Sequence, residues 1–130
     1  MAGRVLLIED EANIAEAIRF ILSREGWQVT VLDTAERAEA AVRDAAPDLV
    51  ILDHMLPGRT GLEVVASLRA DPATTDLPVM MLTAKSQFRD RLAAEEAGVT
   101  HFMTKPFANA EMVAAVRALA DGTGRCAARA

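Results

Sequence analysis

The sequence predicts an α/β protein with a doubly wound, five-stranded parallel sheet. Short apolar runs, typical of strands buried on both faces, alternate with amphipathic helical patterns along the chain. Such alternation implies parallel strands whose connecting helices lie on both faces of one sheet. The 130 residues suit one domain, and 52% hydrophobic residues are sufficient for a packed core. We expect no internal repeat, linker or second domain.

The first two strands flank an amphipathic helix. Residues 5–8 form a continuous apolar run, Val-Leu-Leu-Ile, and predict the first strand. In the helix that follows, one stripe is apolar and consists of Ile14, Ile18, Ile21 and Leu22. Gly26 is expected to end this helix, because glycine is common just past a helix C-terminus. Residues 27–32 predict the second strand.

An alanine-rich helix and a third strand come next. Thr34 is of a type that caps helix N-termini, and we expect it to cap a helix running to about Ala46. The apolar face of this helix is mostly alanine with Val42, so its packing should be close but weak. Pro47 then interrupts the chain before residues 49–52, Leu-Val-Ile-Leu, which predict a third buried strand.

The alternation continues after a loop at Pro57 and Gly58. A third helix carries an apolar stripe of Leu62, Val65 and Leu68. Residues 78–82 predict the fourth strand, and Ser86 is expected to cap a helix that ends near Gly98.

A short fifth strand and a last helix complete the pattern. Residues 101–103 predict the strand, and the helix carries a stripe of Met112, Val116 and Leu119. The chain beyond Asp121 is small, polar and alanine-rich, so we expect residues 1–121 to form the domain and residues 122–130 a flexible tail.

Charge and composition argue against several classes of partner. The formal net charge is −5, with 19 acidic and 14 basic side chains, whereas nucleic-acid and anionic-membrane surfaces need clustered Lys and Arg. No segment approaches the roughly 18 apolar residues of a membrane helix, and the N-terminus lacks a signal-peptide run. The single cysteine, Cys126, excludes an internal disulfide. We therefore expect a cytoplasmic protein that binds neither nucleic acid nor membrane directly.

Reactive side chains follow the apolar runs. Glu9 and Asp10 come directly after the first strand, and Asp53 ends the third. Thr83 ends the fourth strand and Lys105 follows the fifth. Because sites in such folds lie outside the carboxyl ends of the strands, three carboxylates, a hydroxyl and an ammonium should converge at one edge of the sheet.

Neighbouring carboxylates repel one another unless a cation neutralises them. Hard oxygen ligands around an ion that keeps several waters are typical of Mg²⁺. A carboxylate beside Mg²⁺ can act as a nucleophile for phosphoryl transfer, and Lys105 and Thr83 can stabilise the charge on the phosphoryl oxygens. The strand ends thus predict Mg²⁺-dependent phosphoryl chemistry.

Four stretches resemble the signature blocks of receiver domains in bacterial two-component response regulators. They are Ile-Glu-Asp-Glu at 8–11, Leu-Asp-His-Met-Leu-Pro-Gly-Arg-Thr-Gly at 52–61, Leu-Thr-Ala-Lys at 82–85 and Thr-Lys-Pro-Phe at 104–107. The resemblance extends from about Arg4 to Ala120. It implies the chemotaxis-regulator-like, flavodoxin-like (βα)5 fold with strand order 2-1-3-4-5.

The resemblance also implies roles for individual residues. Asp53 would accept a phosphoryl group from a histidine kinase or a histidine phosphotransferase. Mg²⁺ would be held by Glu9, Asp10, Asp53 and the backbone carbonyl of Met55. Lys105 would pair with the phosphoryl oxygens and would precede Pro106 through a cis peptide bond. The protein would be a signalling switch that catalyses only its own phosphorylation and dephosphorylation.

Further positions match the switch and output parts of the family. Thr83 and Phe102 match the pair of residues that rearranges on phosphorylation. Met55 and Lys85 match positions at the mouth of the site and would tune dephosphorylation. The output face for a downstream protein would be formed by the fourth helix, fifth strand and fifth helix, with Phe88, Arg91, His101 and Glu111.

Some residues depart from the family pattern. Thr100 and His101 replace residues that are often acidic and that join Arg91, Glu111 and Arg117 in a dimer network, so we expect a monomer or a weak phosphorylation-dependent dimer. His54 follows the phosphoacceptor, where an apolar residue is common. Strand alternation points it away from the side of Asp53, which favours a packing or surface residue over a metal ligand or a general base.

Three alternatives compete with a phosphorylated switch. A Mg²⁺-dependent aspartyl-phosphate phosphatase of the haloacid-dehalogenase type needs a second carboxylate two residues after the nucleophile, where this chain has Met55. A flavin- or dinucleotide-binding protein would carry a Gly-rich turn after the first strand, which is missing. A pseudo-receiver that only binds partners would be expected to lack some of Asp10, Asp53, Thr83 and Lys105.

Overall fold

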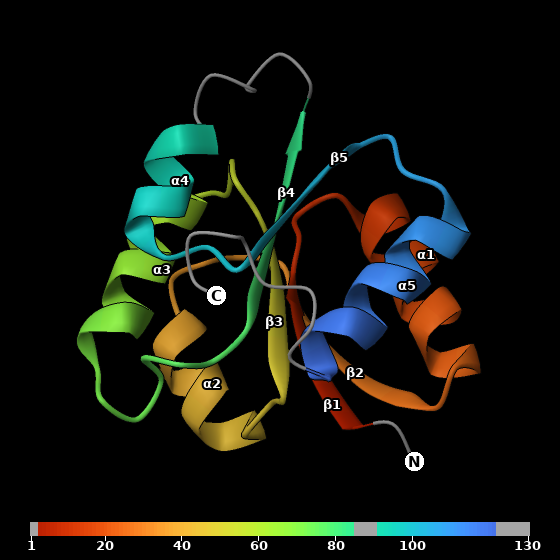
Figure 1. The fold of residues 1–130 in the computed structure, drawn as a ribbon, viewed down its shortest axis with the longest axis horizontal. Coiled ribbons are helices and arrows are strands. Elements are labelled where there is room, and N and C mark those ends of the chain that lie inside the picture. Colours follow the sequence, from red (N-terminus) through yellow and green to blue (C-terminus); the bar gives the residue numbers. More distant parts are fainter. Residues whose placement is uncertain (1–2, 85–90, 122–130) are drawn as a thin grey trace.

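The computed structural model describes residues 3–84 and 91–121 and contains five strands and five helices (Figure 1). The strands are β1 (Gly3–Ile8), β2 (Trp27–Leu32), β3 (Leu49–Asp53), β4 (Val79–Ala84) and β5 (His101–Lys105). The helices are α1 (Ala12–Arg24), α2 (Ala38–Ala45), α3 (Gly61–Ala70), α4 (Arg91–Ala97) and α5 (Asn109–Ala120). None of the helices in these ranges is long and apolar enough to span a membrane.

All five strands belong to one parallel sheet with the order β2-β1-β3-β4-β5. The predicted doubly wound α/β fold and its strand order are therefore confirmed. The order reverses at β1, so that β3 lies on one side of it and β2 on the other. In sheets of this kind, the crevice at such a reversal is the usual place for a site.

Two apolar cores cover the two faces of the sheet. One core joins alternate strand residues such as Leu7 and Ile51 to α1 and α5. The other joins the intervening strand residues, such as Leu6 and Val50, to α2 and α3. Figure 1 shows the same division, with α1 and α5 on one side and α2, α3 and α4 on the other. Burial on both faces explains why the central strands are continuous apolar runs.

The second helix begins later than its sequence suggests. Thr34 does not cap α2, because its hydroxyl accepts a hydrogen bond from the Glu36 amide (3.3 Å), while the helix begins at Ala38. Ala35 is fully buried in the second core, and its carbonyl accepts from the Ala38 amide (3.1 Å) in a tight turn. The prediction of a cap at Thr34 was therefore wrong, since core packing of Ala35 bends the chain before the helix.

The other helix boundaries follow local signals. Gly26 and Gly98 follow α1 and α4 with positive φ angles of 94° and 106°, a conformation that glycine adopts without steric cost. Thr60 caps α3, and its hydroxyl and the Glu63 carboxylate form a reciprocal capping box. The predicted cap at Ser86 and the predicted tail at 122–130 lie outside the described residues.

Candidate functional site

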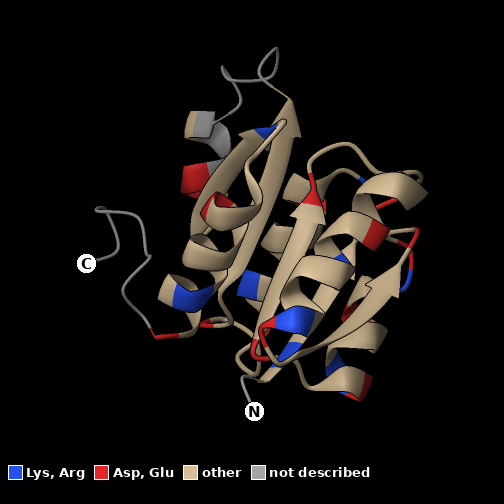
Figure 2. Ribbon diagram, turned by 90° about the vertical axis from the view of Figure 1, so that its right-hand side faces the viewer, with Lys and Arg blue, Asp and Glu red and all other residues tan. Residues whose placement is uncertain are grey.

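The polar strand ends lie at one edge of the sheet, as the sequence predicts. Glu9 directly follows β1, and Asp53 is the last residue of β3. In β4, Leu82 pairs with Asp53, and Thr83 comes next; Lys105 ends β5. Figure 2 shows that charged residues lie at strand ends and on helices, while the middle of the sheet is uncharged. The carboxyl-terminal edge thus places charged groups next to the apolar interior of the sheet.

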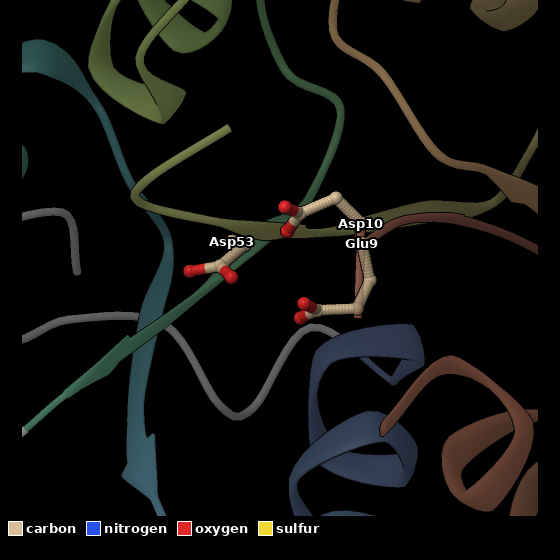
Figure 3. A group of neighbouring side chains, drawn as sticks. All are labelled: Glu9, Asp10 and Asp53. Atoms are coloured by element: carbon tan, nitrogen blue, oxygen red, sulfur yellow. The ribbon is translucent and has the colours of Figure 1, made fainter. Parts of the chain in front are cut away.

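Glu9, Asp10 and Asp53 form a compact carboxylate cluster. One carboxylate oxygen of each lies within 4.8 Å of the others, and Figure 3 shows the three groups pointing toward one another. Glu9 and Asp53 are buried, whereas Asp10 is exposed. Glu9 Oε2 accepts no hydrogen bond within the described part of the chain. Three neighbouring carboxylates that offer hard oxygen donors fit a divalent cation such as Mg²⁺.

Lys105 lies against this cluster and contacts several acids. Its Nζ donates a hydrogen bond to Asp53 Oδ2 at 2.8 Å. It also lies 3.2 Å from Glu9 Oε2, an ion-pair contact without hydrogen-bond geometry, and 3.7 Å from Glu11 Oε1. The Lys105–Pro106 peptide bond is cis, as the resemblance implies. The ammonium is therefore placed directly beside the predicted nucleophile.

Crowding of charge changes the acid–base behaviour of this edge. Burial, and next the negative charge of Asp53, raise the pKa of the Glu9 carboxyl to about 7. For Lys105, burial alone would lower the pKa, but the hydrogen bond to Asp53 and the charges of Asp53 and Glu9 outweigh it and raise the pKa. Lys105 thus stays charged, while Glu9 holds a proton more readily than an ordinary carboxyl does.

The loop after Asp53 brings its backbone back to the site. The Met55 amide donates a hydrogen bond to Asp53 Oδ1 (3.3 Å), and Met55 forms an isolated antiparallel bridge with Thr60. The Met55 side chain is 55% exposed, so it lies at the surface beside the site. Met55 is thus close to Asp53, where the resemblance places a carbonyl ligand and a side chain that flanks the phosphoryl group.

The two switch candidates occupy neighbouring strands. Thr83 is buried, and its hydroxyl donates to the Ala84 carbonyl at 3.3 Å. Phe102 is half-buried and packs against the core under α2 and α3. Thr83 pairs with Thr104 and Phe102 pairs with Met81 in the β4–β5 register, so the two candidates lie two positions apart along this ladder.

The remaining residues predicted for the output face and for tuning dephosphorylation lie away from the carboxylate cluster or outside the described residues. His101 begins β5 and is half-buried, and Glu111 is exposed in the first turn of α5, so both lie away from the carboxylate cluster. Arg91 is the first residue of α4, and only the backbone of Arg91 is described. Lys85 and Phe88 lie outside the described residues. Their output and tuning roles stay predictions.

Two residues that depart from the family pattern are buried. His54 directly follows β3, and its amide donates to the Leu82 carbonyl of β4 at 2.9 Å. Thr100 is also buried, and its hydroxyl accepts from the Val79 amide (3.0 Å) and from Arg69 Nη2 (3.3 Å).

Sequence reasoning did not predict the ion pairs of Glu11 and Arg117. Glu11 has no predicted role but lies 3.7 Å from Lys105. Its place directly after the acidic pair was the available signal. Arg117 of α5 pairs at 2.9 Å with Glu25, the residue directly after α1, a contact that no local pattern indicates.

Comparison with known families agrees with this geometry. Residues 5–117 match the model of the response regulator receiver domain. The chain belongs to this family. Receiver domains are signalling switches of two-component regulatory systems, and the phosphorelay and phosphoprotein character predicted from the sequence fits the family.

The receiver domain resembles curated transcriptional regulators. It is 39% identical over 119 residues to the phosphate regulon transcriptional regulatory protein PhoB of Escherichia coli (strain K12), covering 92% of this chain and 52% of PhoB. It is 42% identical over 118 residues to the DNA-binding response regulator MtrA of Mycobacterium leprae (strain TN), covering 91% of this chain and 51% of MtrA. The chain spans about half the length of these relatives.

Solved receiver structures share the fold. The signal receiver domain of a signal transduction histidine kinase from Syntrophus aciditrophicus is 30% identical, with a TM-score of 0.86 and coverage of 95% of this chain and 94% of that chain. The receiver domain of the Francisella response regulator 1452 is 25% identical, with a TM-score of 0.84 and coverage of 93% and 98%. The flavodoxin-like receiver fold is thus shared along nearly the whole chain.

Proposed function

We propose that this receiver domain is a phosphorylation-activated switch whose phosphoacceptor is Asp53. The observation that supports this most directly is the contact of Lys105 Nζ with Asp53 Oδ2 (2.8 Å) inside a cluster of three carboxylates. A buried carboxylate beside a fixed ammonium and further oxygen donors is the arrangement that phosphoryl transfer to an aspartate requires.

In the proposed reaction, an Asp53 carboxylate oxygen forms a bond to phosphorus while the phosphorus–nitrogen bond of a phosphohistidine breaks. The imidazole of the donor leaves with the electron pair of that bond. Lys105 would move its hydrogen bond from Asp53 to a phosphoryl oxygen, and Thr83 would donate its hydroxyl to another. These contacts offset charge on the phosphoryl group without proton transfer by the protein.

Glu9, Asp10, Asp53 and the Met55 carbonyl are the proposed holders of Mg²⁺. The ion would supply positive charge for the phosphoryl oxygens and would counter the repulsion among the carboxylates. The charge balance of the cluster supports this assignment, because one ammonium, that of Lys105, faces the carboxylates of Glu9 and Asp53 with Asp10 beside them. With few protein ligands, much of the coordination shell would be water, so Mg²⁺ should bind weakly.

Phosphorylation would then change the packing of Thr83 and Phe102 and so the surface of α4, β5 and α5. The donor would be a histidine kinase or a histidine phosphotransferase, and the target would be a protein that binds this surface rather than nucleic acid or a membrane. Residues 1–121 would form the cytoplasmic receiver unit. The phosphorylated domain would be a monomer or a weak dimer.

A pseudo-receiver and an aspartyl-phosphate phosphatase are less well supported. The chain keeps all the charged residues of the phosphorylation site, which a pure binding module does not need. Met55 stands where the phosphatase would carry its acid–base carboxylate. We therefore expect no turnover of an external phosphate ester.

The decisive test is phosphorylation by acetyl phosphate with Mg²⁺, followed by intact-mass spectrometry. The wild-type protein should gain one phosphoryl group, and Asp53→Asn should gain none. Asp48→Asn is a matched control, since Asp48 lies at the opposite end of β3 and accepts from the Arg4 amide. Full phosphorylation of Asp53→Asn would contradict the assignment.

A further inference from the structure

The loop between β3 and α3, residues 54–60, forms charged hydrogen bonds with α2 through the Arg59 side chain. Arg59 forms a two-pronged ion pair with Glu39, with both Nη1–Oε1 and Nη2–Oε2 at 2.7 Å. Arg59 Nη1 also donates to the Ala35 carbonyl at 3.3 Å, at the turn that leads into α2. One guanidinium thus occupies three acceptors of a neighbouring segment.

This contact is less exposed than the ion pairs Arg19–Glu16 and Arg117–Glu25. The side chains of Arg59 and Glu39 are only 25% and 29% exposed, so solvent competes weakly for them. The hydrogen bonds from Arg59 lower the pKa of the Glu39 carboxyl to about 2, and the Ser67 hydroxyl of α3 adds a further hydrogen bond. Two parallel charge-assisted bonds fix the orientation of a planar guanidinium as well as its distance.

The loop has other contacts. Met55 bridges to Thr60, and the Gly61 amide donates to the His54 carbonyl at 2.8 Å. Leu56 packs against the second core, which includes Ala38 and Val42 of α2. Arg59 adds to this apolar packing a charged contact of fixed orientation with α2. The same loop carries Met55, whose carbonyl is a proposed Mg²⁺ ligand.

We propose that Arg59 and Glu39 are positioning residues that hold the Met55 carbonyl in place for Mg²⁺ and so determine the affinity of the site for the ion. This inference rests on the proposed function of the site. Metal ligands must be held within a fraction of an ångström, and groups that orient a ligand without touching the metal commonly change affinity by about tenfold or more. The Arg59–Glu39 pair is such a group on the loop side of the site.

The test is Mg²⁺ binding by calorimetry or amide NMR titration, together with the Mg²⁺ dependence of phosphorylation by acetyl phosphate. Arg59→Met should weaken Mg²⁺ binding about tenfold and Glu39→Gln by less, because the amide keeps one acceptor. At saturating Mg²⁺, both variants should reach a phosphorylation rate within about twofold of wild type. The exchanged pair, Arg59→Glu with Glu39→Arg, should recover most of the lost affinity.

Arg19→Met is the matched control, because Arg19 forms a similar two-pronged pair with Glu16 (2.9 and 3.1 Å) on the exposed face of α1. Its Mg²⁺ affinity should equal that of wild type. Unchanged affinity in folded Arg59→Met would overturn the proposal, and so would an exchanged pair no better than the single variants. If Arg59→Met does not fold, Glu39→Gln and the exchanged pair decide.

The two proposals can fail separately. Mg²⁺ binding that responds to Arg59→Met while wild type accepts no phosphoryl group would retain the loop contact and overturn the proposed function. Normal phosphorylation of Asp53 with an identical Mg²⁺ dependence in all variants would support the proposed function and overturn the positioning role of Arg59 and Glu39.

Discussion

At opposite ends of the sheet, a side-chain cation gathers polar groups from several elements. At the carboxyl ends of the strands, Lys105 lies within 4.0 Å of the carboxylates of Asp53, Glu9 and Glu11. At the amino ends, Arg69 of α3 donates to neutral acceptors. These are the carbonyls of Gly98 and Thr74, both at 3.0 Å, and the hydroxyl of Thr100 at 3.3 Å.

The two centres differ in how the charge of the cation is balanced by the groups around it. The Arg69 guanidinium is matched by acceptors that fix the end of α4, the turn before β4 and the start of β5. At the other edge, one ammonium faces several carboxylates, and the pKa of Glu9 is raised to about 7 by burial and by Asp53. The first centre is suited to holding elements together, and the second retains an attraction for a further cation.

The largest expected effect is on the chemistry of the carboxylate edge. Lys105→Met should slow phosphorylation by acetyl phosphate by two to three orders of magnitude, equivalent to about 3–4 kcal/mol, because a preorganised cation beside the transferring group is lost. The fold should persist, since the rest of the core is unchanged. Stopped reactions analysed by mass spectrometry give the rate, and a rate within a few-fold of wild type would mean that Lys105 is only a structural partner of Asp53.

Substitution of Arg69 should reduce stability and leave the phosphorylation rate unchanged. Arg69→Met should lower the free energy of unfolding by about 2–3 kcal/mol, because partly buried acceptors lose a charged donor. Phosphorylation of the folded protein should proceed at the wild-type rate. Urea unfolding and the acetyl-phosphate assay measure the two quantities. Arg117→Met is a control, because its pair with Glu25 is largely exposed and should contribute about 0.5 kcal/mol or less. Equal losses of unfolding free energy in Arg69→Met and Arg117→Met would contradict a special stabilising role of Arg69.

A smaller effect concerns the lifetime of the phosphorylated state. Hydrolysis needs a water in line with the aspartyl–phosphoryl bond, and Met55 offers no group that orients one. Slow dephosphorylation of the wild type is therefore expected. Met55→Asn combined with Lys85→Ala should speed it about tenfold, or about 1.4 kcal/mol, by opening the approach and adding an amide. Lys85 lies outside the described residues. Met55→Leu with Lys85→Arg, which keeps the bulk, should decay as wild type does; equal decay of all three proteins would exclude gating here.

The smallest expected effect is a pH dependence. Because the folded-state pKa of Glu39 is lowered to about 2, its pair with Arg59 adds stability above the ordinary Glu pKa of 4.5 and loses it as pH falls toward 2. Wild type should therefore exceed Glu39→Gln by about 1 kcal/mol at pH 7, and the gap should close near pH 2. Urea unfolding across pH measures this gap, and a gap of the same size at pH 7 and near pH 2 would contradict the prediction.

Local sequence patterns predicted the strands, the helix faces and the residues at the strand ends. Burial on two faces requires continuous apolar runs, so β1 and β3 are visible in the sequence without any knowledge of their neighbours. Once the strands are parallel, their carboxyl ends must meet at one edge, which places Glu9, Asp53 and Lys105 together. Glycine at the end of a helix is a similarly local signal, as Gly26 and Gly98 illustrate.

By itself, then, the sequence determined the sheet, its layers and the edge that carries the acidic residues, because each depends on periodic burial along short segments. Only the tertiary structure decided the later start of α2 and the contacts of the Arg59, Arg69 and Lys105 side chains. The Arg59–Glu39, Arg69–Gly98 and Lys105–Asp53 contacts join residues 20, 29 and 52 positions apart. Such contacts depend on how close packing orients one element against another, and hydrophobic periodicity within a single element does not encode that orientation.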